Sequence, residues 1–217
     1  MHHRAALATT LTAAVLLLSG CGAADWTTPR PDTTAVGMPA TGFAPSASPS
    51  PEATVTPASG SWEGVSPSPG YRVVLLTRGA DETTATLAAA VTAWAAAESV
   101  DLRGVDADGD AIRGIVQAME LNPELIVTVG EDLIDPLATV TPNHLEVPFL
   151  VLGAELAEPT ANVTAVEWTG AGFRGSGLGS ATQFDPESFT PERGADAIRA
   201  GVAAVLTGMT GVVLWIE

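Results

Sequence analysis

Short apolar runs alternate with longer amphipathic stretches along the chain from about residue 71 onward. Residues 124–130 form one such run, which is mostly apolar and lacks two-residue alternation, as expected of a strand covered on both faces. The run ends at a Gly that permits a sharp turn, and two acidic residues suited to the start of a helix follow it. We interpret this run as the central strand of a parallel sheet. The same reasoning predicts strands over residues 71–77, 100–105, 148–152, 162–168 and 211–216.

The stretches between the predicted strands carry apolar residues at helical spacing, as Leu87, Val91 and Trp94 do. Further helices are predicted around residues 112–119 with Asp110 as the N-cap, around 133–137, over a Gly-rich segment at 173–182, and from Pro191 onward. Strands that alternate with helices of this length imply parallel pairing and right-handed crossovers. The predicted fold class is therefore α/β, a doubly wound, mostly parallel sheet of flavodoxin-like type. Any ligand crevice should lie at the carboxyl ends of its strands.

The N-terminus has the organisation of an export signal. A basic start at residues 2–4 precedes an apolar segment, residues 5–18, that is too short to span a bilayer comfortably. The sequence Leu-Ser-Gly-Cys at residues 18–21 resembles the lipobox of bacterial lipoproteins. That resemblance implies a cleaved signal peptide, residues 1–20, and acyl chains such as palmitate on Cys21. More than one acyl chain gives stable membrane anchoring. The alternative is an ordinary signal peptide with a chance Cys.

Residues 21–70 are rich in Pro, Ser, Thr, Ala and Gly, and nine of the sixteen prolines fall there. Such a composition buries too little apolar surface to offset the entropy of ordering, so we predict a disordered tether behind the lipidated Cys. Trp26 and Trp62 stand out in it as side chains that could dock on the membrane or on the domain. Residues 71–217 are the predicted α/β domain, which is long enough for one sizeable core.

Composition narrows the function classes further. The formal net charge is −16 and all nine basic residues are Arg, which argues against nucleic acid and against a polybasic membrane surface. Cys21 is the only Cys, and His144 is the only His left after processing. We therefore expect no disulfide, no thiol catalysis, no metal site and no cofactor. A catalytic role for His144 is possible, but its turn-like setting favours a surface position.

Two short motifs have a functional form and a simpler interpretation. Residues 106–110 resemble the opening of a calcium loop, but the twelfth position is Gln117 where a Glu is required, so a solvated turn with a helix cap is favoured. Residues 170–175 fit the Gly-x-Gly-x-x-Gly dinucleotide pattern, but they follow the fifth strand and no strand with a terminal acid lies about twenty residues later. Neither motif predicts a cofactor.

Acidic residues gather at the predicted strand ends and could bind a polar solute. They are Asp81, Glu82, Glu131, Asp132 and Glu155. The simpler interpretation is that each favours a helix N-terminus or is merely solvated. The predicted ligand-binding residues are Asp81 and Glu131, whose carboxylates can accept hydrogen bonds, and Gly170 and Gly172, where a ligand can approach the main chain closely.

The chain resembles the basic membrane protein family of ABC-transporter solute-binding lipoproteins. The resemblance rests on Cys21, on residues 124–130, which are similar to the family's Asp-Leu-Ile strand, and on residues 162–181, which are similar to its Asn-Val and Glu-Gly-Ser segment. Asp81 falls where the family has the first Asp of its Asp-x-Ser-Phe-Asn motif, although the Phe-Asn is absent here. The resemblance implies a type 1 periplasmic-binding fold. Because the predicted domain has about half the length of two lobes, we expect one lobe only.

The resemblance also implies a function. We expect a lipid-anchored protein on the extracytoplasmic face of the cell membrane, not an enzyme, that takes part in ABC-type uptake of nucleosides or related small solutes. Its expected partners are a small-molecule solute and an ABC permease. The alternative is an interaction or sensor lipoprotein that retains the fold without a ligand pocket. An enzyme of the cell envelope, with His144 beside a Ser or an acid pair, is the third possibility.

Overall fold

The computed structural model describes residues 26, 28–29 and 31–217. The predicted signal peptide, residues 1–20, and the predicted lipidation site at Cys21 lie outside the described residues. From residue 72 onward the helices and strands are β4 (Arg72–Thr77), α1 (Glu82–Ala97), β5 (Asp101–Asp106), α2 (Ala111–Glu120), β6 (Leu125–Val129), α3 (Ile134–Val140), η1 (Thr141–Asn143), β7 (Phe149–Leu152), β8 (Val163–Glu167), η2 (Pro186–Ser188), α4 (Pro191–Leu206) and β9 (Val213–Trp215).

Together with β2 (Thr54–Val55), these six strands form a seven-stranded sheet with the order β2-β9-β8-β7-β6-β4-β5, and every neighbouring pair is parallel. From β4 to β8 the order is the flavodoxin-like one, in which the chain starts inside the sheet, adds one strand on one side and then continues on the other. The predicted α/β fold class is therefore confirmed. β6 lies inside the sheet between β4 and β7, although the middle of the seven strands is β7.

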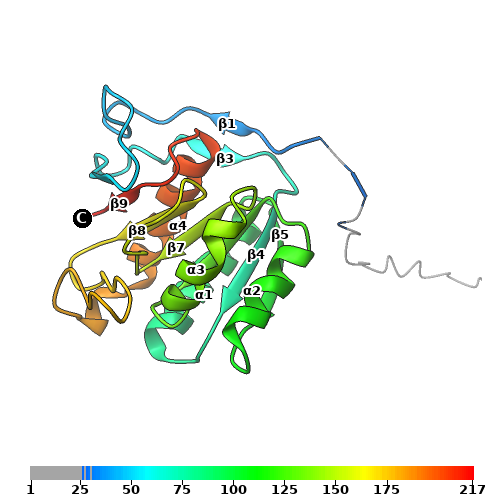
Figure 1. Ribbon diagram of the computed structural model, residues 1–217. Helices are drawn as coiled ribbons and strands as arrows, with labels where there is room; N and C mark the ends of the chain where they lie inside the picture. The colour runs from blue at the N-terminus through cyan, green and yellow to red at the C-terminus, as the bar shows by residue number, and fades with distance from the viewer. Residues whose placement is uncertain (1–25, 27, 30) are drawn as a thin grey trace, which may run out of the picture.

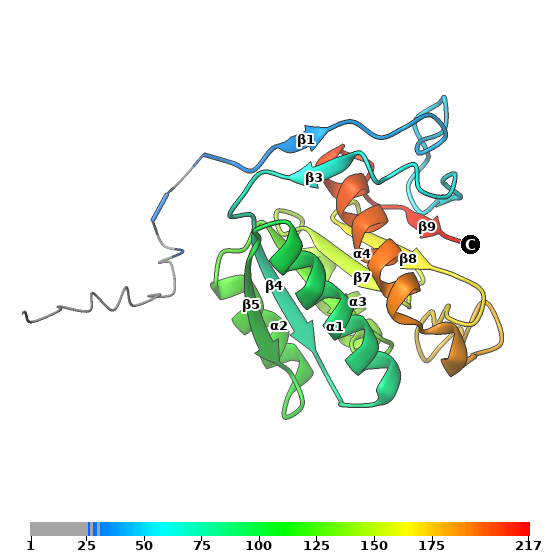
Figure 2. The same cartoon turned by 180° about the vertical axis from the view of Figure 1, so that it is seen from behind.

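Helices cover both faces of the sheet, as Figures 1 and 2 show from opposite sides. Successive strand residues point to opposite faces, so Val73 joins the core under α1 and α4, whereas Val74 joins the core under α2 and α3. The first core contains Leu87 of α1 and Ile198 of α4. Both cores consist mainly of buried aliphatic side chains together with several aromatic ones, which accounts for the continuous apolar strands seen in the sequence.

The segment of residues 31–70 is folded, which corrects the disorder predicted for this part of the tether. It contains β1 (Ala35–Gly37), β2 (Thr54–Val55) and β3 (Val65–Pro67); β1 pairs with β3 antiparallel, and β2 pairs with β9 at the sheet edge. Phe43 is 1% exposed and Trp62 is 2% exposed, and both belong to the first core. The prediction failed over residues 35–67 because a few large apolar side chains in a Pro-rich segment bury themselves against the rest of the domain.

Trp26 docks on the domain at the amino ends of β4 and β5. Its Nε1 donates a 2.7 Å hydrogen bond to Oδ2 of Asp101, and the guanidinium carbon of Arg103 lies 4.0 Å from the centre of its ring. Nη1 of Arg72 donates to the carbonyl oxygen of Trp26 over 2.8 Å. From the sequence, Trp26 and Trp62 could dock either on the membrane or on the domain, and in the structure both are buried against the domain.

One helix cap predicted from the sequence is confirmed, and one predicted helix is absent. Asp110 caps α2 as predicted, because its Oδ1 accepts a hydrogen bond from the backbone N–H of Arg113. The helix predicted over residues 173–182 is absent, and the segment forms turns and isolated bridges in its place. Gly175 and Gly179 have φ angles of 100° and 71°, which no α-helix accommodates.

Candidate functional site

A cavity of about 340 Å³ lies at the carboxyl ends of β4, β6 and β7, the edge at which the topology predicts a ligand crevice. The start of α1, the turns after β6 and β7, and the segment before α4 surround it. Four carboxylates and two aromatic rings dominate its lining, and they are Asp81, Glu82, Glu131, Asp132, Phe184 and Phe189. The predicted site residues Asp81 and Glu131 are thus brought together.

Asp81 is held as a carboxylate by the first turn of α1. It is the N-cap of this helix, and its Oδ1 accepts hydrogen bonds from Thr83 Oγ1 at 2.6 Å and from the backbone N–H of Thr84 at 3.0 Å. Partial burial works against ionisation, but these hydrogen bonds outweigh it and lower the pKa of Asp81 to about 2. A carboxylate oxygen can accept further hydrogen bonds, so Asp81 can serve the helix and a ligand together.

Glu131 differs from Asp81 in its electrostatic setting. Partial burial raises its pKa, and the negative charges of Asp132 and Asp81 raise it further. The mutual repulsion shows that the cavity concentrates negative charge, which favours ligands that bring hydrogen-bond donors or positive charge. The turn after β6 can lie close to the start of α1 because residue 130 is Gly. Its φ is 79°, and a Cβ there would lie 2.9 Å from Oγ1 of Thr84.

Two phenylalanines form an apolar wall beside the carboxylates. Phe189 is buried, and its ring centre lies 5.1 Å from that of Trp168 in an edge-on arrangement. Phe184 is 49% exposed, and its ring centre lies 5.7 Å from that of Phe189. An exposed aromatic side chain over a cavity offers a face on which a planar ligand can stack. The sequence analysis did not select these two residues, because nothing in the chain before α4 marks which loop residues turn toward the cavity.

The other two predicted site residues lie elsewhere. The backbone N–H of Gly170 donates to Oγ1 of Thr182, and its carbonyl oxygen accepts from the backbone N–H of Asp185, so its main chain ties together the loop between β8 and α4. A Cβ at Gly172 would lie 3.4 Å from Oε2 of Glu167. Neither glycine lines the cavity of Asp81 and Glu131.

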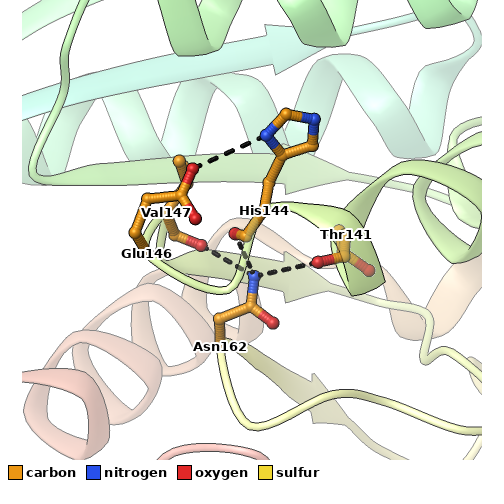
Figure 3. A network of polar contacts seen from close by, with 5 residues as sticks. All are labelled: Thr141, His144, Glu146, Val147 and Asn162. Atoms are coloured by element: carbon orange, nitrogen blue, oxygen red, sulfur yellow. Dashed lines mark hydrogen bonds and ion pairs between the residues drawn. The ribbon is translucent and has the colours of Figure 1, made fainter.

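His144 lies at the opposite edge of the sheet, in the loop that leads into β7 (Figure 3). Its Nδ1 is 3.6 Å from Oε1 of Glu146. Its carbonyl oxygen accepts a 2.9 Å hydrogen bond from Nδ2 of the buried Asn162, which also donates to the carbonyl oxygen of Val147. This network fastens the loop to the start of β8, so the structure assigns His144 a position in a surface loop away from the cavity.

The carboxylates of the acidic loop, residues 106–110, accept hydrogen bonds from nearby backbone N–H groups. Asp106 Oδ1 accepts from the N–H of Asp108, Asp108 Oδ1 accepts from the N–H of Gly79, and Asp110 caps α2. Across the described part of the chain, no group of three or more His, Cys, Asp or Glu side chains is arranged to hold a metal ion. No helix within the described residues is long and apolar enough to cross a membrane.

No protein-family model matches this sequence, and no curated protein matches it. Among solved structures, similarity is found to a fragment described as a candidate lipoprotein from Peptoclostridium difficile 630, with 16% identity and a TM-score of 0.44 over 64% of this chain and 99% of that one. A solute-binding protein of an ABC transporter system from Aeropyrum pernix K1 has 20% identity and a TM-score of 0.39 over 46% of this chain. A periplasmic ribose ABC transporter protein from Conexibacter woesei DSM 14684 has 17% identity and a TM-score of 0.33 over 68% of this chain.

This chain spans 29% of the length of the Aeropyrum protein and 54% of the length of the Conexibacter protein. With identities and TM-scores this low, the assignment of the fold rests on the strand order and the two helical layers. Together with the cavity, they define the class of the molecule: a parallel α/β protein with an acidic, partly aromatic cavity at the carboxyl edge of its sheet.

Proposed function

We propose that this chain is an extracytoplasmic, lipid-anchored protein of the solute-binding type, which binds a small polar solute at the carboxyl edge of its sheet as part of ABC-type uptake. The observation that carries the proposal is the cavity itself, in which Asp81 and Glu131 converge from two different strand ends. Its volume of about 340 Å³ falls at the lower end of the range for small-molecule sites. The resemblance to the basic membrane protein family supports the same class of ligand-binding lipoprotein.

Nucleosides and related small solutes fit the chemistry of this cavity. A planar base can stack on the exposed ring of Phe184, and sugar hydroxyl or exocyclic amino groups can donate to the carboxylate of Asp81. Phosphorylated ligands are disfavoured because four acidic side chains line the cavity and would repel a phosphate. Burial, together with the charges of Asp132 and Asp81, already raises the pKa of Glu131. The proposed ligand is therefore an uncharged or cationic ring compound with several hydrogen-bond donors.

Isothermal titration calorimetry with a panel of nucleosides, sugars and amino acids tests the proposal. Loss of a carboxylate that holds a buried ligand hydrogen bond should cost about 1.5–3 kcal/mol, so Asp81→Ala should weaken binding roughly ten- to a hundred-fold. Phe184→Ala should weaken the binding of ring compounds and leave the binding of open-chain solutes unaffected. Glu120→Ala, an exposed change at the far end of α2, is the matched control. If no solute binds, or if Asp81→Ala binds as tightly as the parent, the solute-binding proposal is wrong.

Lipid anchoring at Cys21 is a second element of the proposal. The Leu-Ser-Gly-Cys sequence at residues 18–21 supports it. Cys21→Ser should block lipid addition and release the protein from membranes, as measured by fractionation and by incorporation of labelled fatty acid. A Cys21→Ser variant that remains in the membrane and still carries fatty acid would show that the lipobox interpretation is wrong.

The short spacer between Cys21 and Trp26 bears on how an anchored domain would be oriented. Five residues reach at most about 18 Å when fully extended. Trp26 contacts Asp101 and Arg103 at the amino edge of the sheet, so lipidation would hold this edge near the bilayer. The cavity at the carboxyl edge would then open away from the membrane.

This orientation favours a second candidate function, an interaction or sensor lipoprotein that retains the fold without a ligand pocket, because the carboxyl edge of the sheet would face the surroundings of the cell more than a permease in the bilayer. Energy transfer to labelled lipid headgroups measures the orientation. With Cys21 acylated, Glu120→Cys and Leu178→Cys each supply a single free thiol, at the amino and carboxyl edges respectively. The label at position 120 should lie closer to the bilayer. Equal transfer from both positions would remove the argument for the sensor role.

A further inference from the structure

A second cavity, of about 250 Å³, lies at the same edge of the sheet but on the side of β8 and β9. It is enclosed by the loop after β7, the loop after β8, the strand β9 and the segment that leads into β2. Its charged lining consists of Glu52, Glu155, Glu167 and Arg174. The first cavity shares none of these residues.

Glu167 is the last residue of β8, and its side chain is part of the wall of this cavity although it is only 1% exposed. Its Oε1 atom is buried and has no hydrogen-bond partner among the described residues. A buried carboxyl oxygen without a donor is unfavourable, and more so when it is charged. Such an atom at the wall of a cavity is therefore suited to receive a donor from a bound molecule.

Arg174, the basic residue in the lining of this cavity, pairs with Glu155 and not with Glu167. Nε of Arg174 lies 2.5 Å from Oε1 of Glu155, and the two groups form an ion pair. Counting Glu52 at the exposed rim, three carboxylates face one guanidinium. The cavity therefore holds more carboxyl groups than cations, and Glu167 is the most deeply buried of these carboxyl groups.

Gly172 lies beside Glu167 in the loop after β8. Its φ angle is 101°, and a Cβ at this position would lie 3.4 Å from Oε2 of Glu167, with the side chains of Ala181 and Thr182 at similar distances. These distances are ordinary contacts, so it is the positive φ angle, which residues with a side chain rarely adopt, that favours Gly here. The turn at Gly172 thus lies against the carboxyl group of Glu167.

We propose that this second cavity binds a small organic cation through an ammonium group that donates to the buried carboxylate of Glu167. An ammonium supplies the hydrogen bonds and the positive charge that Glu167 lacks, and its alkyl part can lie against Val213 and Trp215 of β9. A divalent metal ion is less suited, because no group of three or more acidic, His or Cys ligands is arranged for it among the described residues. This site is distinct from the cavity of Asp81 and Glu131, and it does not depend on the solute-binding function proposed for that cavity.

Binding of the cation should be linked to a proton. Burial raises the pKa of Glu167 to about 8, the charge of Glu155 contributes in the same direction, and Arg174 opposes it. The charged groups that face Glu167 from the neighbouring segments are Glu155, Arg174 and Glu52. Because an ammonium pairs with the ionised form of Glu167, binding must displace the proton below this pKa, and affinity should rise with pH up to about 8 and then level off.

Calorimetric titration of the full chain with 1,4-diaminobutane at pH 6, 7.5 and 9 tests the proposal. The diamine stays charged over this range, since alkyl ammonium groups titrate near pH 10. Affinity should be roughly ten-fold or more weaker at pH 6 than at pH 9, and the heat measured at pH 7.5 should depend on the ionisation enthalpy of the buffer because a proton is released. The neutral analogue 1,4-butanediol should not bind. Calcium chloride serves as the metal probe, and tight binding of calcium in place of the diamine would overturn the choice of ligand.

Glu167→Gln is the decisive variant, because a neutral amide of the same shape replaces a carboxyl that is protonated at neutral pH, so the fold should persist. It should lose diamine binding at pH 9 by roughly ten- to a hundred-fold, together with the pH dependence. Glu158→Gln, an exposed change in the loop after β7, is the control. If Glu167→Gln binds the diamine as tightly as the parent, or if Glu131→Gln abolishes the binding that Glu167→Gln retains, the cation belongs to the first cavity and the proposal is wrong.

Discussion

Trp26 donates a 2.7 Å hydrogen bond to Asp101 across 75 positions of sequence. This bond fixes the segment before the sheet to the amino end of β5, and Arg103 covers the indole ring from one side. The ring is 4% exposed, so a residue of apparently unstructured composition belongs to the folded domain. The domain consequently begins close behind Cys21, and any lipid there would act on the domain through a short spacer.

Trp26→Ala should destabilise the domain. The substitution removes a buried aromatic ring, its hydrogen bond to Asp101 and its contact with Arg103, and changes of this type cost roughly 3–5 kcal/mol in cores. Urea denaturation followed by circular dichroism measures the change in the free energy of unfolding. Met38→Ala is the control, because Met38 is 81% exposed and its loss should stay within about 0.5 kcal/mol. Equal stability of the two variants would show that Trp26 is not docked in solution.

Limited proteolysis should leave a core that begins before β1, not at Tyr71. Phe43 and Trp62 belong to the core under α1 and α4, and β2 completes the sheet beside β9. Trp62→Ala should therefore cost roughly 3–5 kcal/mol and expose residues 35–67 to protease. Mass spectrometry of the protected fragment identifies its first residue. A stable fragment that starts at Tyr71 in the parent protein would show that the residues before it are disordered, as the composition predicts.

Asp81 should contribute to stability in a pH-dependent manner. Its pKa in the folded domain is about 2, against an ordinary value of 3.8, so its contribution is fully present above about pH 4 and is lost as pH falls through about 2. Asp81→Asn retains a capping side chain but removes this pH dependence, whereas Asp81→Ala also loses the cap and should cost about 1 kcal/mol. Thermal unfolding between pH 2 and pH 6 separates the two variants. Parallel melting curves for Asp81→Asn and the parent would contradict the shifted pKa.

Glu167 should act on stability in the opposite direction. Its pKa is raised from 4.5 to about 8 in the folded domain, so the folded state holds a proton that the unfolded state releases. Stability should therefore fall as pH rises from about 4.5 to about 8 and then level off, by an amount on the order of a few kcal/mol. Glu167→Gln should be the more stable protein at pH 9, and Glu158→Gln should follow the parent. A pH profile of Glu167→Gln that falls as the parent's does would place the responsible group elsewhere.

Local signals in the sequence determined the elements that short-range chemistry controls. Continuous apolar runs predicted β4, β6, β7, β8 and β9, because a strand buried on both faces needs no alternation. The signal for the edge strand β5 was weaker, since its sequence contains charged residues and a Gly. Asp81 and Asp110 were readable as residues at helix N-termini, since a short acidic side chain before an apolar periodic stretch satisfies free backbone N–H groups. Parallel topology then followed from the alternation of strands and helices, and it correctly placed the cavity of Asp81 and Glu131 at the carboxyl edge.

Contacts between distant segments were decided by tertiary structure alone. Composition predicts disorder for residues 21–70, yet Phe43 and Trp62 find a core to which helices and strands far along the chain contribute. Positive φ angles at Gly175 and Gly179 exclude the helix predicted over residues 173–182, and the segment is part of the loop that carries Gly172 and Arg174. Glu167 looks like any acid at the end of a strand, and only the folded chain shows that its Oε1 atom is buried with no hydrogen-bond donor among the described residues. Burial and pairing depend on what packs against a residue, and the residues nearby in sequence do not contain that information.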